Sequence, residues 1–326
     1  MVQLTEVTKY YGRKRALGPV SCEIEKGDTV GFLGLNGVGK TTLLRILACG
    51  LRPSSGRVRI DGLDVLQDPH EVRKRVGYLP EIPPVYRDMT VRDYLAFAGR
   101  IKGMTPEAVA RRIPEVEERA RVTEVADMPA GHLSQGYRQR VGVAQAIIHE
   151  PELLILDEPT HDLDPVQIME MRGMIRSLKD SHTILISSHI LPEISQTCDR
   201  LLILDDGEIV ASGTEEELGE MLLQSRRVAV TVREGGGEEN NGSAANEGAA
   251  MVIGRIPGVI GVRRSDRGEG AIEETGTVTF EVECKTDLRA EVCRVLVENG
   301  YDVIALARAQ RDLERVFVGL VGRERT

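Results

Sequence analysis

The chain has no tryptophan, and only 3% of its 326 residues are aromatic. Proteins that bind single-stranded nucleic acid by stacking need aromatic side chains, so few surfaces of that kind can form here. An excess of positive charge is missing as well. The net charge of −9 provides no overall basic field of the kind that attracts nucleic acid. The composition favours an acidic globular protein over a general nucleic-acid binder.

Long apolar runs and paired cysteines are also missing. No stretch approaches the roughly 18 uninterrupted apolar residues of a transmembrane helix, and residues Met1–Glu6 lack the basic and apolar regions of a signal peptide. The five cysteines include no Cys-x-x-Cys pair, and an odd number argues against a disulfide framework. We therefore expect a cytoplasmic protein with reduced thiols.

Residues 34–42 read Gly-Leu-Asn-Gly-Val-Gly-Lys-Thr-Thr and fit the phosphate-binding pattern Gly-x-x-x-x-Gly-Lys-[Ser/Thr]. A β-prone run over 29–33 leads in and a run with helical spacing over 42–48 leads out, so a strand ends where a helix begins. Lys40 can then reach the β and γ phosphates, and Thr41 can ligate Mg2+. The motif predicts that a nucleoside triphosphate is bound by Gly34, Asn36, Gly37, Gly39, Lys40, Thr41 and Thr42.

Two carboxylates, Asp157 and Glu158, follow the wholly apolar run 153–156. An acidic pair at the end of an apolar strand is costly unless a cation lies in front of it. Asp157 is placed to hold a Mg2+ ion that bridges the β and γ phosphates. Glu158 is placed to orient or deprotonate the water that attacks the γ phosphorus.

From Leu4 to about Leu223 short β-like runs alternate with helical patterns, which is typical of an α/β domain. The strand signal disappears between Thr90 and His149, and this predicts a helical subdomain inserted into the α/β core. Thr90 and Thr105 are placed as helix N-caps. The predicted strands are 57–60, 76–79, 153–156, 183–187 and 201–204.

The last hundred residues suggest a smaller domain. Residues 234–250 contain almost no bulky apolar side chain, and we expect them to form a flexible loop. The flanking pattern is that of a split βαβ, ferredoxin-like domain. A final helix would carry an apolar stripe that must be buried, and docking on this chain's own domains is favoured over docking on a partner. The predicted elements are β 228–233, α 247–256, β 259–264, β 277–283, α 286–298, β 302–307 and the helix with Leu313, Val316, Phe317, Leu320 and Val321.

The run Leu133-Ser-Gln-Gly-Tyr137 precedes an amphipathic helix and stands between the phosphate loop and the acidic strand. It resembles the signature motif of ATP-binding cassette (ABC) ATPases, placed as in that family between Walker A (34–41) and Walker B (153–158). The resemblance covers nearly all of residues 2–220.

The resemblance implies an α/β P-loop NTPase core with an antiparallel β subdomain, in an ATP-binding domain over residues 1–223. The helical subdomain would cover about 82–150. Outside the resemblance, the pattern of predicted elements makes residues 224–326 a small α+β, ferredoxin-like accessory domain that contains the loop 234–250.

The same resemblance assigns roles to residues outside the two Walker motifs. His189 looks like the switch histidine that contacts the γ phosphate, Asp164 like the D-loop aspartate, and Tyr11 like the aromatic residue that stacks on adenine. Ser134 and Gly136 would bind a second anion at a helix N-terminus. Within one chain this site should lie too far from Lys40 to share a phosphate, and the family resolves this with a head-to-tail dimer that sandwiches two ATP molecules.

The chain departs from the family pattern at three places. Glu81 stands where a glutamine is usual, and its carboxylate would either ligate Mg2+ or water or face the transmembrane partner. Gln135 replaces the commoner glycine of the signature. His161-Asp162 is atypical in the D-loop, and we interpret His161 as an ordinary structural histidine, like His132, His149 and His182.

The leading interpretation is the ATPase subunit of an ABC exporter or efflux system, similar to antibiotic-resistance, sodium-efflux and gliding-associated members, that uses ATP and Mg2+. A separate permease would hold it on the inner face of the membrane, with a second copy as its dimer partner and no nucleic acid bound. The alternative is a soluble ABC ATPase that acts on ribosomes or DNA. For the C-terminal domain a dimer-stabilising role is favoured over a ligand-sensing one.

Overall fold

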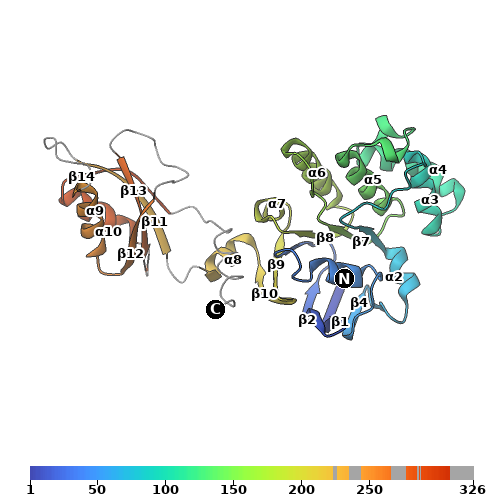
Figure 1. Cartoon of the computed structure of the whole chain (residues 1–326), viewed down its shortest axis with the longest axis horizontal. Coiled ribbons are helices and arrows are strands. Elements are labelled where there is room, and N and C mark those ends of the chain that lie inside the picture. The colour runs from blue at the N-terminus through green and yellow to red at the C-terminus, as the bar shows by residue number, and fades with distance from the viewer. Residues whose placement is uncertain (223–225, 235–243, 266–276, 285, 287, 309–326) are drawn as a thin grey trace. The chain divides into compact units, whose positions relative to one another are not determined.

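The structure is a computed structural model that describes residues 1–222, 226–234, 244–265, 277–284, 286 and 288–308 (Figure 1). The chain divides into two compact units, Met1–Leu218 and Gly219–Thr326. The first unit carries every motif identified above.

A six-stranded sheet forms the centre of the first unit. Its order is β10-β9-β3-β8-β7-β6, with β10 antiparallel to β9 and the other pairings parallel. Strands β3, β7 and β8 are buried at every position, which explains their apolar sequences, because helices cover parallel sheets on both faces. The strands are β3 (Thr29–Leu33), β6 (Val76–Leu79), β7 (Leu153–Asp157), β8 (Thr183–Ser188), β9 (Arg200–Asp205) and β10 (Glu208–Gly213).

A second, antiparallel sheet has the order β2-β1-β4-β5. Side chains from this sheet, from helix α1 and from the central strands share one hydrophobic core. The elements are β1 (Val2–Tyr11), β2 (Lys14–Ile24), α1 (Lys40–Leu47), β4 (Ser55–Ile60), β5 (Leu63–Asp64) and α2 (Pro69–Arg75). The five strands predicted for the α/β domain all form, with bounds that differ only at their ends.

Helices replace strands between β6 and β7, as the sequence predicts. The predicted N-caps are confirmed, since Thr90 accepts a hydrogen bond from Asp93 N and Thr105 accepts one from Ala108 N. Figure 1 shows α3, α4 and α5 grouped on the side of the central sheet away from β1 and β2. The helices between α2 and β11 are α3 (Val91–Ile101), α4 (Pro106–Arg119), α5 (Gln135–Ile147), α6 (Pro165–Leu178), α7 (Leu191–Ser195) and α8 (Glu215–Leu222), and α8 contains the boundary between the two units.

The described part of the second unit follows the order β-α-β-β-α-β. Its sheet has the order β12-β13-β11-β14, and every pairing is antiparallel. Alternate residues of β11 and β13, among them Val230 and Phe280, form a core with α9 and α10. The elements are β11 (Arg226–Glu234), α9 (Ala244–Gly254), β12 (Val259–Ser265), β13 (Thr277–Cys284), α10 (Arg289–Glu298) and β14 (Tyr301–Arg308).

The expected flexible loop over 234–250 is wrong at both ends. Glu234 closes strand β11, and residues 244–250 belong to helix α9. The alanines of this segment are strong helix formers, and Ala249 is buried in the core of the unit. The rest of the expected loop, 235–243, and the final helix expected over 313–321 lie outside the described residues.

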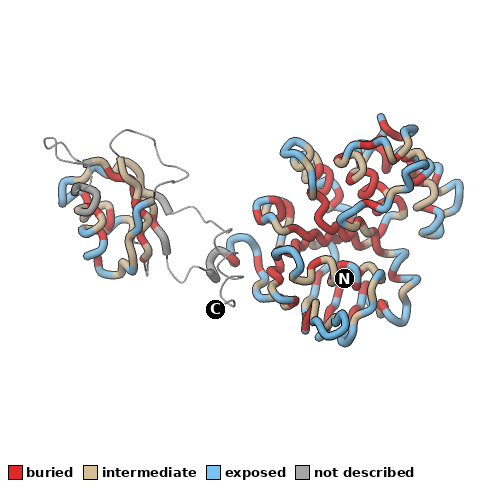
Figure 2. Tube along the Cα trace, in the orientation of Figure 1, coloured by how far each residue is buried: buried red, intermediate tan, exposed pale blue. Residues whose placement is uncertain are grey.

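Burial is concentrated along the central sheet of the first unit, where Figure 2 shows a continuous band of buried residues. Within the described residues, each helix is too short or too polar to cross a membrane.

Strand β6 packs closely on helix α5 at Gly77. A Cβ atom added at Gly77 would lie 2.2 Å from the Ala146 carbonyl oxygen, and backbone cannot yield cheaply. We expect Gly77→Ala to lower stability by about 1–3 kcal/mol, the usual cost of overpacking. Gly173→Ala in α6 meets open space and should raise stability by about 0.5–1 kcal/mol. Thermal unfolding of the nucleotide-free protein tests both variants, and equal shifts would contradict the packing argument.

Candidate active site

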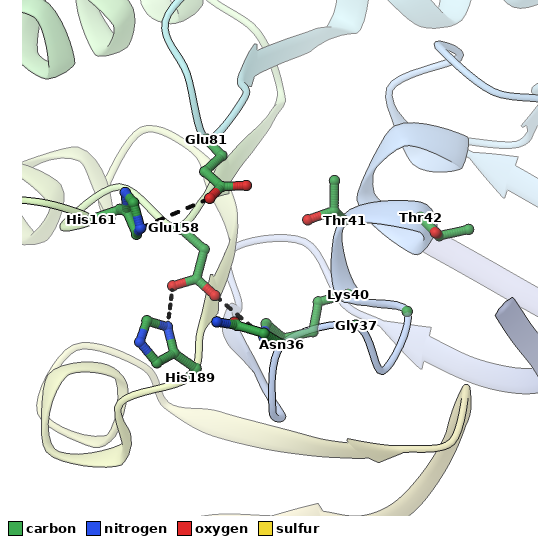
Figure 3. Close-up of a pocket in the computed structure, with 10 residues that line it drawn as sticks. Asn36, Gly37, Lys40, Thr41, Thr42, Glu81, Glu158, His161 and His189 are labelled. Carbon is green, nitrogen blue, oxygen red and sulfur yellow. Dashed lines mark hydrogen bonds and ion pairs between the residues drawn. The ribbon is translucent and has the colours of Figure 1, made fainter.

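A cavity of about 360 Å3 opens at the carboxyl ends of β3, β7 and β8, where open α/β sheets bind ligands. Figure 3 shows side chains from the phosphate loop on one wall and Glu158, His189, His161 and Glu81 on the facing wall. The lining residues are Asn36, Gly37, Gly39, Lys40, Thr41, Thr42, Glu81, Glu158, His161 and His189.

The phosphate loop joins β3 to α1. Gly37 and Gly39 have φ angles of 87° and 110°, in the left-handed region that favours glycine. A Cβ atom at Gly39 would also lie 2.5 Å from the Ala16 carbonyl oxygen. Helix α1 begins at Lys40, so its free N–H groups point toward the cavity that the loop lines. The loop is therefore built to bind an anion.

Lys40 is buried within this loop, with 5% of its surface exposed. Its Nζ donates to the carbonyl oxygens of Gly34 (2.6 Å) and Leu35 (3.2 Å) and lies 3.3 Å from Glu158 Oε1. A lysine is seldom buried without partners of this kind. The ammonium group is thus held inside the phosphate loop, where it can form an ion pair with a bound phosphate.

Glu158 lies between two cationic or titratable groups (Figure 3). One carboxylate oxygen faces Lys40, and the other lies 2.9 Å from His189 Nδ1. The backbone of Glu158 has a φ of 48°, and its N–H donates to Ser187 Oγ at 2.9 Å. The turn after β7 thereby directs the carboxylate into the cavity, where it can orient or deprotonate a water molecule.

Asp157 supplies an oxygen suited to a metal ion. The residue is fully buried, and its Oδ1 accepts hydrogen bonds from Ser187 Oγ (2.6 Å) and Thr41 Oγ1 (3.2 Å). Its Oδ2 is buried and has no hydrogen-bond partner in the described part of the chain. Burial raises the pKa of Asp157. Because Mg2+ takes carboxylate and hydroxyl oxygens, Asp157 and Thr41 fit this ion.

Glu81 reaches the cavity from the loop after β6. Its side chain is 46% exposed, and its Oε1 lies 3.9 Å from His161 Nε2. The backbone oxygen of Glu81 accepts a hydrogen bond from Gln139 Nε2 at 3.1 Å, which ties this loop to helix α5. Among the described residues no hydrogen bond or ion pair joins Glu81 to Asp157 or Thr41, although the charge of Glu81 adds to burial in raising the pKa of Asp157, so the role of Glu81 as a metal ligand stays a prediction.

His161 is a cavity residue that sequence analysis missed. The sequence favours an ordinary structural role for His161, but the residue lines the cavity opposite the phosphate loop. Its place two residues after Pro159 in the acidic motif was the available signal. By contrast, His149 and His182 do bind backbone carbonyl oxygens, those of Val76 (3.1 Å) and Pro151 (2.6 Å).

Six predicted site residues are not among the cavity-lining residues. Two of them, Gly34 and Asp157, still bind cavity residues, because Gly34 O accepts from Lys40 Nζ and Asp157 Oδ1 accepts from Thr41 Oγ1.

The other four do not contact the cavity residues in this way within the described part of the chain. Ser134 caps α5 by accepting from Tyr137 N, and Asp164 caps α6 by accepting from the backbone N–H groups of its first turn. Gly136 lies against the side-chain amide of Gln167. Tyr11 is 48% exposed at the end of β1, with Lys9 Nζ 5.5 Å from its ring centroid. Within a single chain the signature residues Ser134 and Gly136 therefore do not line the cavity that Lys40 lines.

Comparison with known proteins identifies relatives of the chain. The model of the family described as "ABC transporter" matches residues 17–161. The bacitracin transport ATP-binding protein BcrA of Bacillus licheniformis is 32% identical over 99% of this chain and 97% of its own length. The daunorubicin resistance ATP-binding protein DrrA3 of Streptomyces coeruleorubidus is 32% identical over 97% of this chain and 94% of its own.

A solved structure is similar to the first unit. The dimeric post-hydrolysis state of the ATP-binding cassette MJ0796 bound to ADP and Pi has a TM-score of 0.61 and 27% identity. It covers 66% of this chain and 98% of its own. The P-loop core expected from the sequence is thereby confirmed.

Because Asp157 is buried, we expect the difference in stability between the wild type and Asp157→Asn to depend on pH. The pKa of Asp157 is raised in the folded chain, so the folded state is destabilised relative to the unfolded state when the pH is high enough to ionise the carboxyl group. This destabilisation disappears as the pH falls below the ordinary carboxyl range, because the group is then protonated in both states. We expect nucleotide-free Asp157→Asn to unfold at a higher temperature than the wild type at about pH 7, with a gap that shrinks toward about pH 4. The exposed Asp180→Asn is the control, and a gap independent of pH would contradict the argument.

Proposed function

The chain belongs to the ATP-binding subunits of the ABC transporter family, which are ATPases, and on this premise we propose that it powers export through a separate membrane permease. The observation that carries the proposal is the arrangement of Glu158 between Lys40 and His189 at the mouth of the phosphate loop. It combines a phosphate-binding cation with a base in one cavity.

Hydrolysis follows from these groups. The Lys40 ammonium exchanges its contacts with Gly34 and Glu158 for contacts with the β and γ phosphates. Glu158 is then free to accept a proton from the attacking water, whose oxygen bonds to the γ phosphorus as the bond from that phosphorus to the ADP oxygen breaks. His189 holds the Glu158 carboxylate through Nδ1 before ATP binds and donates to the γ phosphate afterwards. Gly37, Gly39 and the start of α1 supply the backbone N–H groups that surround the phosphates.

We infer that Mg2+ is held by Thr41 and Asp157, with Glu81 as a third candidate ligand. The support is the unpartnered Oδ2 of Asp157 in the described structure and the placement of Glu81 on the cavity wall. When bound, the ion neutralises negative charge on the β and γ phosphates.

Members of this family work as dimers, and for this chain we propose a head-to-tail arrangement. Ser134 and Gly136 begin helix α5, whose N-terminus is an anion site that the chain's own cavity does not use. In a head-to-tail dimer they would contact the ATP bound by the partner, with Asp164 along the seam. Tyr11 would stack on the adenine of its own subunit. The dimeric MJ0796 cassette bound to ADP and Pi supports a dimeric unit.

Export is supported by the relatives that match nearly the whole chain, because their names refer to bacitracin transport and daunorubicin resistance. The segment after Glu81 exposes Ile82 (81%) and Tyr86 (53%), which suits contact with a permease helix. We propose that this contact holds the subunit on the inner face of the membrane. The C-terminal unit, which the two relatives' alignments also cover, is proposed to stabilise the dimer.

Glu158→Gln removes the base but keeps its size and hydrogen bonding. We expect ATP binding to survive and turnover to fall at least about 100-fold, the usual effect of losing general-base catalysis. Lys40→Ala should instead weaken nucleotide binding, because it removes the phosphate-contacting cation. Binding of a fluorescent ATP analogue and phosphate release separate the two effects. Normal turnover in Glu158→Gln would refute the role of Glu158.

The Glu158→Gln protein, trapped with Mg-ATP in its native host, identifies the partner. We expect a multi-span membrane protein to co-purify from detergent-solubilised membranes in stoichiometric amount, as mass spectrometry would show. Lys40→Ala, which should not be trapped, is the matched control. Recovery of ribosomal or DNA-bound material alone would favour a soluble ABC ATPase instead.

A further inference from the structure

A buried hydrogen bond joins the loop after β7 to helix α7. Thr160 Oγ1 donates to Glu193 Oε2 over 2.5 Å, and each residue is only 9% exposed. Neither is among the residues that line the cavity, and the hydrolysis scheme above uses neither. Burying a carboxylate costs free energy unless hydrogen bonds or ion pairs compensate for the lost water. The bond from Thr160 therefore stabilises the buried Glu193 carboxylate.

Glu193 has a fixed position relative to the phosphate loop. Its helix packs on β3 so closely that a Cβ atom at Gly31 would lie 2.5 Å from Ile194 Cγ1. Thr197 Oγ1 also donates to the Glu193 carbonyl oxygen at 3.1 Å, which secures the end of the helix. Because β3 leads directly into the phosphate loop, this packing fixes the helix that carries Glu193 against the strand that leads into the loop.

Thr160 lies in both of the turns that form the loop between Glu158 and Asp164. His161 N donates to the Glu158 carbonyl oxygen at 3.0 Å, and Leu163 N donates to the Thr160 carbonyl oxygen at 3.3 Å, so two turns overlap at Thr160. The loop begins with the proposed base and ends with Asp164, the N-cap of α6. The hydrogen bond from Thr160 to Glu193 therefore helps to set the positions of both Glu158 and Asp164.

We propose that Thr160 and Glu193 are positioning residues of the ATPase. Their hydrogen bond fixes the position of the loop 158–164 relative to the phosphate loop. In this position Glu158 contacts the water at the γ phosphate, and Asp164 faces the partner subunit. The second effect rests on the head-to-tail dimer proposed above. Neither side chain contacts the cavity, so binding of ATP to a single subunit does not depend on the bond, whereas turnover and ATP-driven dimerisation do.

Thr160→Val removes the hydroxyl while keeping the shape of the side chain. In otherwise native protein we expect kcat to fall about tenfold with KM nearly unchanged, the scale of one hydrogen bond to a charged group. In the Glu158→Gln background the ATP concentration for half-maximal dimerisation, measured by light scattering, should rise about tenfold. Thr160→Ser keeps the hydroxyl and should restore both values.

Thr183→Val is the matched control, because it removes a buried hydroxyl that accepts from Gly27 N at the start of β8, away from the cavity. It should lower the unfolding temperature and leave kcat and dimerisation unchanged. If Thr160→Val does not fold, Glu193→Gln takes its place, since the amide keeps the volume but is a weaker, uncharged acceptor, and a smaller shift in the same direction supports the proposal.

Two outcomes separate this inference from the proposed dimer. If Thr160→Val and Glu193→Gln fold, turn over ATP and dimerise as the parent proteins do, the positioning role is refuted. If Glu158→Gln itself does not dimerise with ATP, the head-to-tail dimer is refuted, and the positioning role is then decided by the kcat of Thr160→Val alone.

Discussion

The buried ion pair between Lys40 and Glu158 is the interaction on which the site depends. Both side chains are more than 90% buried, so each charge requires the other while no phosphate is bound. The pair also joins the two halves of the site, because Lys40 begins α1 after β3 and Glu158 follows β7. In the proposed mechanism a bound phosphate would replace Glu158 as a partner of Lys40, so that ligand binding and preparation of the base would be a single event.

The sheet makes this pairing possible. Strands β3, β8 and β7 are adjacent and parallel, so the loops at their carboxyl ends converge on one edge although they are far apart in the chain. Behind that edge Ser187 binds both Asp157 and the backbone of Glu158, and Glu193 binds Thr160. The functional groups in the cavity are thus supported by a layer of buried hydroxyl and carboxylate groups, which fixes their positions and cannot be replaced by apolar packing alone.

Much of this could be predicted from the sequence. The phosphate loop and the acidic strand are local patterns, so Lys40, Thr41, Asp157 and Glu158 were found without the structure, and the apolar runs identified the central strands. Prediction failed where composition was a poor guide. Residues 244–250 lack bulky side chains, which predicts a loop, although the sequence also predicts a helix from 247. They form part of α9 because alanine favours helix and Ala249 contacts the core of its unit.

The sequence by itself determined the fold class, the nucleotide-binding motifs and the order of the elements, because these depend on local spacing and hydrophobic periodicity. Only the tertiary structure decided which side chains meet. It placed His161 beside Glu81 in the cavity wall, paired His189 with Glu158 and buried Thr160 against Glu193. These contacts join segments that follow different strands, and no local pattern specifies them, because they arise only when parallel strands bring their ends together.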